Sequence, residues 1–468
     1  MENIKKRASL KLPARAGVWN VISGLIARGV GVVGTPLFTR LLTPAEYGLY
    51  PHYTTWLSVL TALVTAGLTG SAIYRGLQKY SHRSEEFISA ATGLALGTSC
   101  ALILIGIPLA PILTSITGLE GRILLALGAE IAFSSTVALR SATLRYRYKY
   151  KVLALINLFS AIGTPLLSVM LVLLTPYRAE ARIIGSLLAT LITALPALLY
   201  AARRGRLFDP EIWRYLTRVN LPLVPHYLSS ALILRISEIV IGREHGNAAL
   251  AKYSVGISVG LALTFIANAL SQASAPWILR KVSAGEHAKV RELITPALGA
   301  LIAVSVILLA LAPEILAVIT PPEYSDALPT VYPLALSVSA IFLSNVISSA
   351  EAYYERSARA ALPTVLTAVA SVSLAVILLP SVDYRLCALF TLGAYIMLVS
   401  LSSLTFKKIS GERIIDGKKC ALLFSSGAFY AFLMFVFRGV LMSRVLLAIP
   451  VLPALYSLAK RVYGEIRE

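Results

Sequence analysis

Long apolar stretches alternate with short basic or polar breaks along nearly the whole chain, from residue 16 to residue 459. A helix needs about 20 apolar residues to cross the hydrocarbon core of a membrane. Inside lipid the backbone must satisfy its own hydrogen bonds, which a helix does within a single segment. The pattern therefore predicts an all-α polytopic membrane protein with about 14 transmembrane helices. We place these helices at residues 17–39, 52–74, 88–113, 121–139, 152–174, 181–202, 219–242, 250–278, 293–317, 329–353, 360–380, 385–405, 420–437 and 441–459.

The composition agrees with a membrane protein, and the sequence lacks the motifs of common enzymes and metal sites. Hydrophobic residues make up 57% of the chain, and the mean hydropathy is +0.75. The three cysteines and five histidines lack the spacing of a disulfide framework, a metal site or a nucleophile–base pair. No phosphate-binding glycine loop of an ATPase occurs either. We expect a transporter and no enzyme, with no cofactor and no metal, driven by an ion gradient or by the gradient of its substrate.

Basic residues are distributed very unevenly between the two sets of loops. With both ends on one side, the loops of that side hold 32 of the 43 lysines and arginines, and the opposite loops hold nine. Basic loops stay in the cytoplasm. We therefore predict a multi-pass protein of the cell membrane with both termini cytoplasmic and an uncleaved first helix. The net charge of +20 reflects this topology, so no nucleic acid is expected as a partner.

The longest basic loop divides the first twelve predicted helices into two groups of six. Arg28, Tyr47 and Arg75 in the first group recur at similar spacing as Arg235, Tyr253 and Arg280 in the second, which suggests a parallel repeat. The predicted organisation is a basic N-terminus at 1–16, a six-helix bundle at 17–202, a basic linker at 203–218, a second six-helix bundle at 219–405, a basic loop at 406–419, and two additional helices with a cytoplasmic tail at 420–468.

The segment after the first predicted helix has the chemistry of a helix start. Thr43 as N-cap, Pro44 at the first helical position and Glu46 three residues after the cap form a capping box. The segment 320–323, Thr-Pro-Pro-Glu, predicts the same device before the tenth helix. In each case a tyrosine follows the glutamate, where aromatic side chains anchor helices at the membrane surface. Much of this segment is therefore explained by a helix start with an interfacial anchor.

The same segment carries a family resemblance. RLLTPAEYGLY, from Arg40 to Tyr50, resembles the polysaccharide-transport (Wzx-like) flippases of the multidrug/oligosaccharidyl-lipid/polysaccharide exporter superfamily. The motif residues after the first helix are Arg40, Thr43, Pro44, Glu46, Tyr47 and Gly48.

Two further segments are similar to patterns of this family. Residues 235–238, leading to Gly246 and Lys252-Tyr253, resemble the seventh-helix pattern, in which the position of Glu238 is more often Asp. Residues 324–327 resemble the loop before the tenth helix. The resemblance implies two six-helix bundles around a central cavity, often with two extra C-terminal helices. It also implies movement of a lipid-linked oligosaccharide from the cytoplasmic to the outer leaflet.

Four ionisable residues fall deep within predicted helices: Arg28, Glu130, Arg235 and Glu238. Each costs about 2.5–3.5 kcal/mol near the bilayer centre, so each faces a cavity or a partner. Arg28 and Arg235 are candidate substrate-binding residues, because the guanidinium fork suits a pyrophosphate. Packing against a carboxylate is the alternative for both, and Arg235 and Glu238 are spaced to pair on one helix face. Glu130 is either the counter-ion of an arginine from another helix or a proton-binding site for coupling. We therefore treat Glu130 and Glu238 as coupling or counter-ion candidates.

The sequence thus predicts a flippase that exports a polyprenyl-pyrophosphate-linked oligosaccharide by alternating access. The glycan would be an O-antigen, capsule or exopolysaccharide repeat unit. Expected partners are this substrate, membrane lipids, H⁺ or Na⁺ as coupling ion, and the polysaccharide polymerase and glycosyltransferases of the same pathway. The alternatives are a cation-coupled multidrug antiporter of the same superfamily, a membrane-embedded glycosyltransferase or ligase, and a peptidoglycan-precursor flippase.

Overall fold

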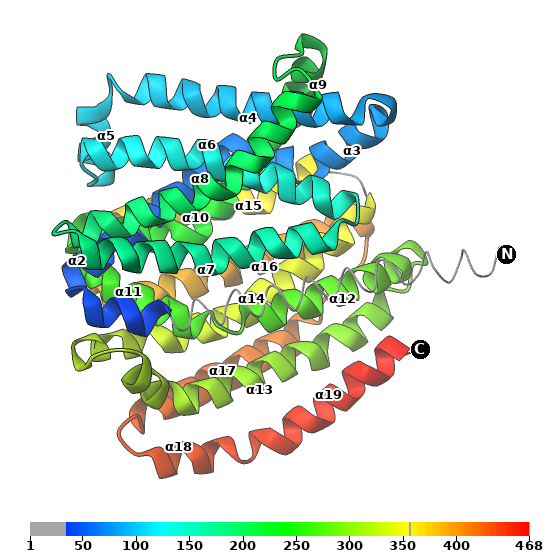
Figure 1. The fold of residues 1–468 in the computed structure, drawn as a ribbon. Coiled ribbons are helices and arrows are strands. Elements are labelled where there is room, and N and C mark those ends of the chain that lie inside the picture. Colours follow the sequence, from blue (N-terminus) through cyan, green and yellow to red (C-terminus); the bar gives the residue numbers. More distant parts are fainter. Residues whose placement is uncertain (1–33, 355–356, 468) are drawn as a thin grey trace. The chain divides into compact units, whose positions relative to one another are not determined.

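The computed structural model describes residues 34–354 and 357–467, and this part of the chain contains helices and no strand (Figure 1). The predicted all-α fold is confirmed. Residues 34–41 are helical. The α-helices that follow are α2 (Pro44–Thr65), α3 (Ser71–Lys79), α4 (Ser84–Gly106), α5 (Ala110–Thr117), α6 (Gly121–Tyr146), α7 (Tyr150–Leu174), α8 (Arg178–Arg204), α9 (Pro210–Asn220), α10 (Val224–Val240), α11 (Gly246–Gly260), α12 (Thr264–Ser283), α13 (His287–Ile319), α14 (Leu328–Glu351), α15 (Ser357–Leu378), α16 (Cys387–Ser410), α17 (Gly417–Val436), α18 (Leu441–Ala448) and α19 (Val451–Arg467).

Twelve helical segments in the described residues are long and apolar enough to cross a membrane. Eleven of them correspond one to one to predicted helices 2–6 and 9–14. The twelfth, Pro210–Gly260, covers the seventh predicted helix and the start of the eighth, which continues in α12. The predicted helix at 17–39 lies outside the described residues except for its last few positions. A multi-pass membrane protein with about the predicted number of membrane-spanning helices is therefore confirmed.

Two predicted helices are interrupted in the structure. The helix predicted at 52–74 consists of α2 and α3, separated by a 3₁₀ turn at Ala66–Thr69. Ala66 has a φ of 28°, which is a strained backbone conformation for a residue with a side chain. The helix predicted at 250–278 is similarly divided into α11 and α12 by the turn at 261–263. The first interrupted helix begins within the family segment 40–50, and the second contains Gly246 and Lys252-Tyr253 of the next family segment.

The chain divides into two compact units. One holds the chain up to Ala231 together with Gly246–Ala248, and the other holds Leu232–His245 and the chain from Ala249 onward. The division falls inside α10, a few residues into the second bundle predicted at 219–405. The exact bounds of the two six-helix bundles remain a prediction.

Small residues bring helices of the first unit into close contact. On α8, a Cβ added to Gly185 would lie 2.4 Å from the Cα of Ser168 on α7. The Ser168 hydroxyl donates a hydrogen bond to the carbonyl of Arg182 at 3.0 Å. Close backbone approach at small residues is how helices associate in lipid, where apolar surfaces gain little by meeting one another.

The second unit is built around α14, whose most apolar part is largely buried. Helices α12, α13, α16 and α17 pack on it, and α19 runs alongside α13 (Figure 1). Arg444 of α18 is 1% exposed; it donates hydrogen bonds to the carboxylate of Glu314 and to the carbonyl of Ala310, both on α13. A buried arginine requires such compensation. The ion pair therefore ties α18 to α13.

Two arginines that the loop count placed on the outer side are buried in helices instead. Arg182 lies in α8 and Arg444 in α18, at 7% and 1% exposure. Both begin an apolar stretch, and both find partners on other helices, which a loop count does not register. Removing them from the outer loops makes the charge asymmetry larger.

Reporter fusions test the orientation that this asymmetry predicts. Residue 206 lies between α8 and α9, and residue 415 lies between α16 and α17. Because these loops are rich in basic residues, fusions at both positions should report a cytoplasmic location, and a fusion at 325 should report an external one. Alkaline phosphatase and green fluorescent protein fusions measure the two states. An external signal at 206 would contradict the predicted topology and the repeat.

Candidate functional site

The motif segment begins α2 with the predicted capping box. Thr43 is the N-cap, and its backbone N–H donates to Oε2 of Glu46 at 2.8 Å. The N–H of Glu46 donates in return to the Thr43 hydroxyl at 3.4 Å. Pro44 is the first helical residue. Arg40 is exposed and donates to the carbonyl of Pro36 at 3.2 Å. This part of the motif therefore fixes where α2 starts.

The glycine of the motif permits a backbone contact. A Cβ on Gly48 would lie 1.8 Å from the carbonyl oxygen of Asn247, at the start of α11. No side chain fits at that distance, so only glycine allows this approach. One turn further, Nδ1 of His52 lies 3.0 Å from Oδ1 of Asn247. The first family motif thus holds the first residues of α11 against α2.

The tyrosine of the motif is not an interfacial anchor, contrary to the prediction. Tyr47 is 4% exposed, and its ring packs under the guanidinium of Arg182. The Arg182 Cζ lies 4.1, 4.4 and 4.2 Å from the ring centroids of Phe38, Tyr47 and Tyr50. Aromatic faces attract a cation at this distance, and more strongly when water is excluded. The Nη1 of Arg182 is buried without a hydrogen-bond partner in the described residues.

Glu130 lies in the middle of α6, is 3% exposed, and accepts three hydrogen bonds from hydroxyl groups. Tyr53 donates to Oε2 at 2.7 Å, and Ser186 and Thr190 donate to Oε1 at 2.9 and 3.1 Å. No basic side chain of the described residues forms an ion pair with it. Hydroxyl groups both donate and accept, so they can satisfy the carboxyl group with or without its proton.

Tyrosines on one face of α2 connect the arginine stack with this carboxyl group. Tyr47, Tyr50 and Tyr53 recur every third residue, which places them on the same side of the helix. Tyr47 and Tyr50 contact Arg182, and Tyr53 contacts Glu130. The Tyr50 hydroxyl also lies 3.4 Å from that of Ser186. The motif helix therefore joins a buried cation and a buried carboxyl group in the first unit.

In the second unit, Arg235 and Glu238 of α10 form the ion pair that their spacing allows. Nη1 of Arg235 lies 2.8 and 3.0 Å from the two carboxylate oxygens. The Arg235 side chain is 27% exposed, and that of Glu238 is 4% exposed. No acceptor among the described residues bonds to Nε or Nη2 of Arg235. The observed pair therefore leaves part of the guanidinium group for a further anion.

The remaining family segments of the second unit meet at an acidic residue. Asp326 lies 2.9 Å from both Nζ of Lys252 and Nη2 of Arg385. Asp326 belongs to the 3₁₀ helix Pro322–Ala327. The capping box predicted at 320–323 is wrong, because Thr320 is the C-cap of α13 and the 3₁₀ helix that follows has Pro321 as N-cap, with no side-chain cap hydrogen bond. Tyr324 is fully buried and so does not anchor the helix at the membrane surface.

Comparisons with known proteins identify the family of this chain. Residues 37–306 match the model of a family described as "Polysaccharide biosynthesis protein". The chain belongs to this family. The Wzx-like resemblance predicted from the sequence is therefore confirmed. Among curated protein sequences, none matches the chain.

Solved structures show the fold of this family member. It is similar to the lipid II flippase MurJ in an inward closed conformation, with a TM-score of 0.73 and 13% identity over 95% of this chain and 99% of that chain. It is also similar to an inward-facing multidrug resistance MATE family transporter of the MOP superfamily, with a TM-score of 0.59 and 17% identity over 83% and 95% of the two chains. The third similar structure is a MOP superfamily transporter from Pyrococcus furiosus, with a TM-score of 0.53 and 16% identity over 90% of this chain and 96% of that chain. The predicted two-bundle fold is confirmed.

The candidate residues of this family member fall into three groups. Glu130 and the motif residues lie in the first unit, and the Arg235–Glu238 pair lies in the second. Arg28 lies outside the described residues. Arg182 was not among the candidates from the sequence, although it begins an apolar stretch and tyrosines recur every third residue along α2. That combination of a lone arginine and an aromatic helix face is the signal that would have identified it.

Proposed function

We propose that the protein is a flippase that moves a polyprenyl-pyrophosphate-linked oligosaccharide from the inner to the outer leaflet by alternating access. Membership of the polysaccharide biosynthesis family is the observation that carries this proposal. The MurJ-like fold supports it, because that protein is itself named a flippase for a lipid-linked substrate. The protein would act in the cell membrane with both termini cytoplasmic, between the glycosyltransferases and the polymerase of one pathway.

Reconstitution into liposomes tests the transport step. A lipid-linked oligosaccharide with a labelled sugar is placed in both leaflets, and a membrane-impermeant enzyme modifies the outer pool. Active flippase should make nearly the whole pool accessible, whereas liposomes without protein should stop at about half. Accessibility unchanged by the protein, in vesicles where it is correctly folded, would contradict the proposal. A change in the mass of the lipid-linked sugar would instead favour a glycosyltransferase or ligase.

A multidrug antiporter is the second candidate, because the fold is also similar to that of a MATE family transporter. Expression in a drug-sensitive host separates the two. Resistance to cationic drugs without any effect on surface glycan would favour the antiporter. Loss of the protein distinguishes a peptidoglycan-precursor flippase, because its absence would stop cell-wall synthesis and not only surface polysaccharide.

We propose that Arg28 and Arg235 bind the pyrophosphate of the substrate, one from each half of the chain. Substitution Arg28→Ala should abolish glycan export while the protein still inserts, because the pyrophosphate loses a charge partner. Arg28→Lys should restore export only partly, since a point charge cannot form two parallel hydrogen bonds. Export is measured as surface glycan in a complementation assay, alongside membrane protein level. The exposed Arg178, replaced by alanine, is the control. Full export by Arg28→Ala would remove this residue from the site.

A double-mutant cycle separates pairing from substrate contact at Arg235. If Arg235 only neutralises Glu238, each single alanine substitution strands a buried charge, and the double substitution recovers protein level and export. If Arg235 binds substrate, the double variant is inserted normally but stays inactive. We expect the second result, because the pair uses only one nitrogen of the guanidinium group. A fully active double variant would leave Arg28 as the remaining arginine candidate.

We propose further that Glu130 is the coupling residue and exchanges H⁺ or Na⁺ during transport. Its partners are three neutral hydroxyl groups, an environment that accommodates both protonation states. Together, the two carboxylate oxygens of Glu130 and the three hydroxyl oxygens are ligands of the kind that hard cations prefer. The alternative, that Glu130 is a counter-ion, requires a basic partner from outside the described residues.

A further inference from the structure

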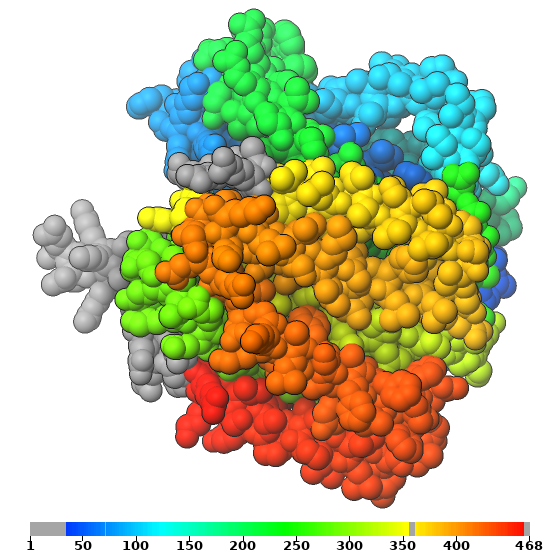
Figure 2. Space-filling model, turned by 180° about the vertical axis from the view of Figure 1, so that it is seen from behind, coloured from blue at the N-terminus to red at the C-terminus, as the bar shows by residue number. Residues whose placement is uncertain are grey.

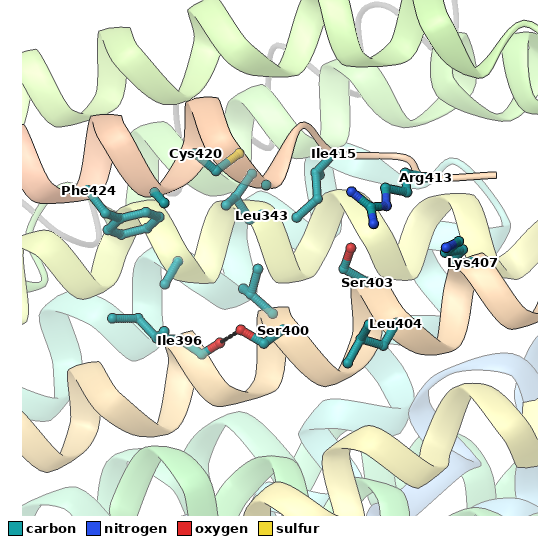
Figure 3. Close-up of a pocket in the computed structure, with 14 residues that line it drawn as sticks. Leu343, Ile396, Ser400, Ser403, Leu404, Lys407, Arg413, Ile415, Cys420 and Phe424 are labelled. Atoms are coloured by element: carbon teal, nitrogen blue, oxygen red, sulfur yellow. Dashed lines mark hydrogen bonds between the residues drawn. The ribbon is translucent and has the colours of Figure 1, made fainter.

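A cavity of about 400 Å³ lies in the second unit, away from the Arg235–Glu238 pair and from Asp326. Helices α16 and α17 both pack on α14. The space left between them forms a groove whose floor includes Ala340 and Leu343 of α14 (Figure 3). The fourteen residues that line it are mostly apolar and come from these three helices and the loop at 411–416.

The charged residues of this groove lie at one end. Figure 3 shows Lys407 of α16 and Arg413 of the loop toward one end of the groove, and Phe424 and Ile396 toward the other. Both basic side chains are exposed, and neither forms an ion pair within the described residues. No carboxylate lines the groove. Gly417, the first residue of α17, also lines the groove, and the carboxylate of Asp416 caps this helix by accepting from the N–H of Lys419.

The apolar part of the groove is accessible from the side. Ile396 and Leu404 line it and are 43% and 59% exposed. They belong to a helix that is apolar enough to span the membrane, and large apolar side chains exposed on such a helix suit contact with lipid. Helices α16 and α17 can be followed in orange, next to the red C-terminal helices, in Figure 2. The groove thus has an apolar part that lipid can reach from the side and a basic end at the loop between α16 and α17.

We propose that this groove binds an anionic phospholipid of the surrounding membrane. One acyl chain lies on α14 between α16 and α17, and the phosphate group lies between Lys407 and Arg413. Basic residues next to membrane helices attract anionic headgroups. The volume suits one acyl chain, whereas a polyprenyl chain is several times longer. The lining also lacks the cluster of polar groups that a sugar requires. The bound lipid would hold α17 against α14 and α16.

Native mass spectrometry of the purified full-length protein tests this directly. The probes are phosphatidylglycerol, phosphatidylethanolamine and undecaprenyl phosphate, each added to delipidated protein. We expect phosphatidylglycerol to bind at least about tenfold more tightly than phosphatidylethanolamine, and the double variant Lys407→Glu/Arg413→Glu to lose that preference. Lys408→Glu is the matched control, because Lys408 is exposed on the same helix but does not line the groove.

A second pair of variants tests the apolar part without changing charge. Ala421→Phe places a ring in the groove, whereas Leu422→Phe alters the next position, which is 71% exposed and outside it. Only Ala421→Phe should weaken phosphatidylglycerol binding, with both variants unfolding at the same temperature. An equal loss in Lys408→Glu would show general surface attraction and overturn the proposal. Tighter binding of undecaprenyl phosphate, lost in the same variants, would also overturn it, because the groove would then belong to the substrate.

Discussion

Substitution Glu130→Gln should reduce glycan export to background while the protein remains in the membrane at near-normal level. Glutamine keeps the shape of the side chain: its oxygen can still accept from Ser186 and Thr190, and its amide N–H can donate to the Tyr53 hydroxyl, so the packing of α6 against α2 and α8 is retained. It cannot release or bind a proton, and it offers a cation no negative charge. Surface glycan and membrane protein level are measured together.

Two further variants make the Glu130 result specific. Glu120→Gln, at an exposed carboxylate that pairs with Arg122, should export normally. Tyr53→Phe removes one of the three donors and should reduce export only partly. Normal export by Glu130→Gln would exclude coupling at this residue, and the carboxyl group would then have a structural role. Loss of the protein itself would point to the same structural role.

Substitution Gly48→Ala should sharply lower the amount of folded protein. The new methyl group would lie 1.8 Å from the carbonyl oxygen of Asn247, and a backbone atom cannot move aside as a flexible side chain can. Overpacking usually costs about 1–3 kcal/mol, and contact with backbone puts this case at the upper end. Membrane protein level and the midpoint of thermal unfolding in detergent measure the effect.

Gly393→Ala is the control for this experiment. Gly393 lies inside α16, and nothing lies within 4 Å of the position where its Cβ would be. Alanine favours the helix by about 1 kcal/mol over glycine, so this variant should be as stable as the parent or slightly more stable. Equal behaviour of the two variants would show that the contact between Gly48 and Asn247 relaxes without cost.

The sequence predicted those features that depend on local chemistry. The apolar stretches identified the helices because lipid leaves the backbone no alternative. Thr43, Pro44 and Glu46 identified the start of α2 because a capping box involves only neighbours in the chain. The pairing of Arg235 with Glu238 was anticipated for the same reason, since both lie on one helix face.

Features that depend on contacts between helices were predicted only in part or missed. The sequence identified Glu130 as a buried ionisable residue, but two of its three donors lie 56 and 60 residues away on α8. Tyr47 has the position of an interfacial anchor in the sequence, yet it is buried because Arg182 covers its ring. The capping box predicted at 320–323 does not form because α13 continues to this point, so that Thr320 ends α13 and Pro321 is the N-cap of the next helix.

The ion pair between Arg444 and Glu314 bears on the order in which the chain is assembled during synthesis. Glu314 enters the membrane with α13, and its partner is made 130 residues later. Until then the carboxylate has to stay protonated or remain near water, because an unpaired charge in lipid is costly. Docking of α18 is therefore a late step that only the complete chain can take. A ribosome-bound chain ending before residue 441 should leave Glu314 more reactive toward a carboxyl-reactive reagent than the finished protein, in which Arg444 pairs with it.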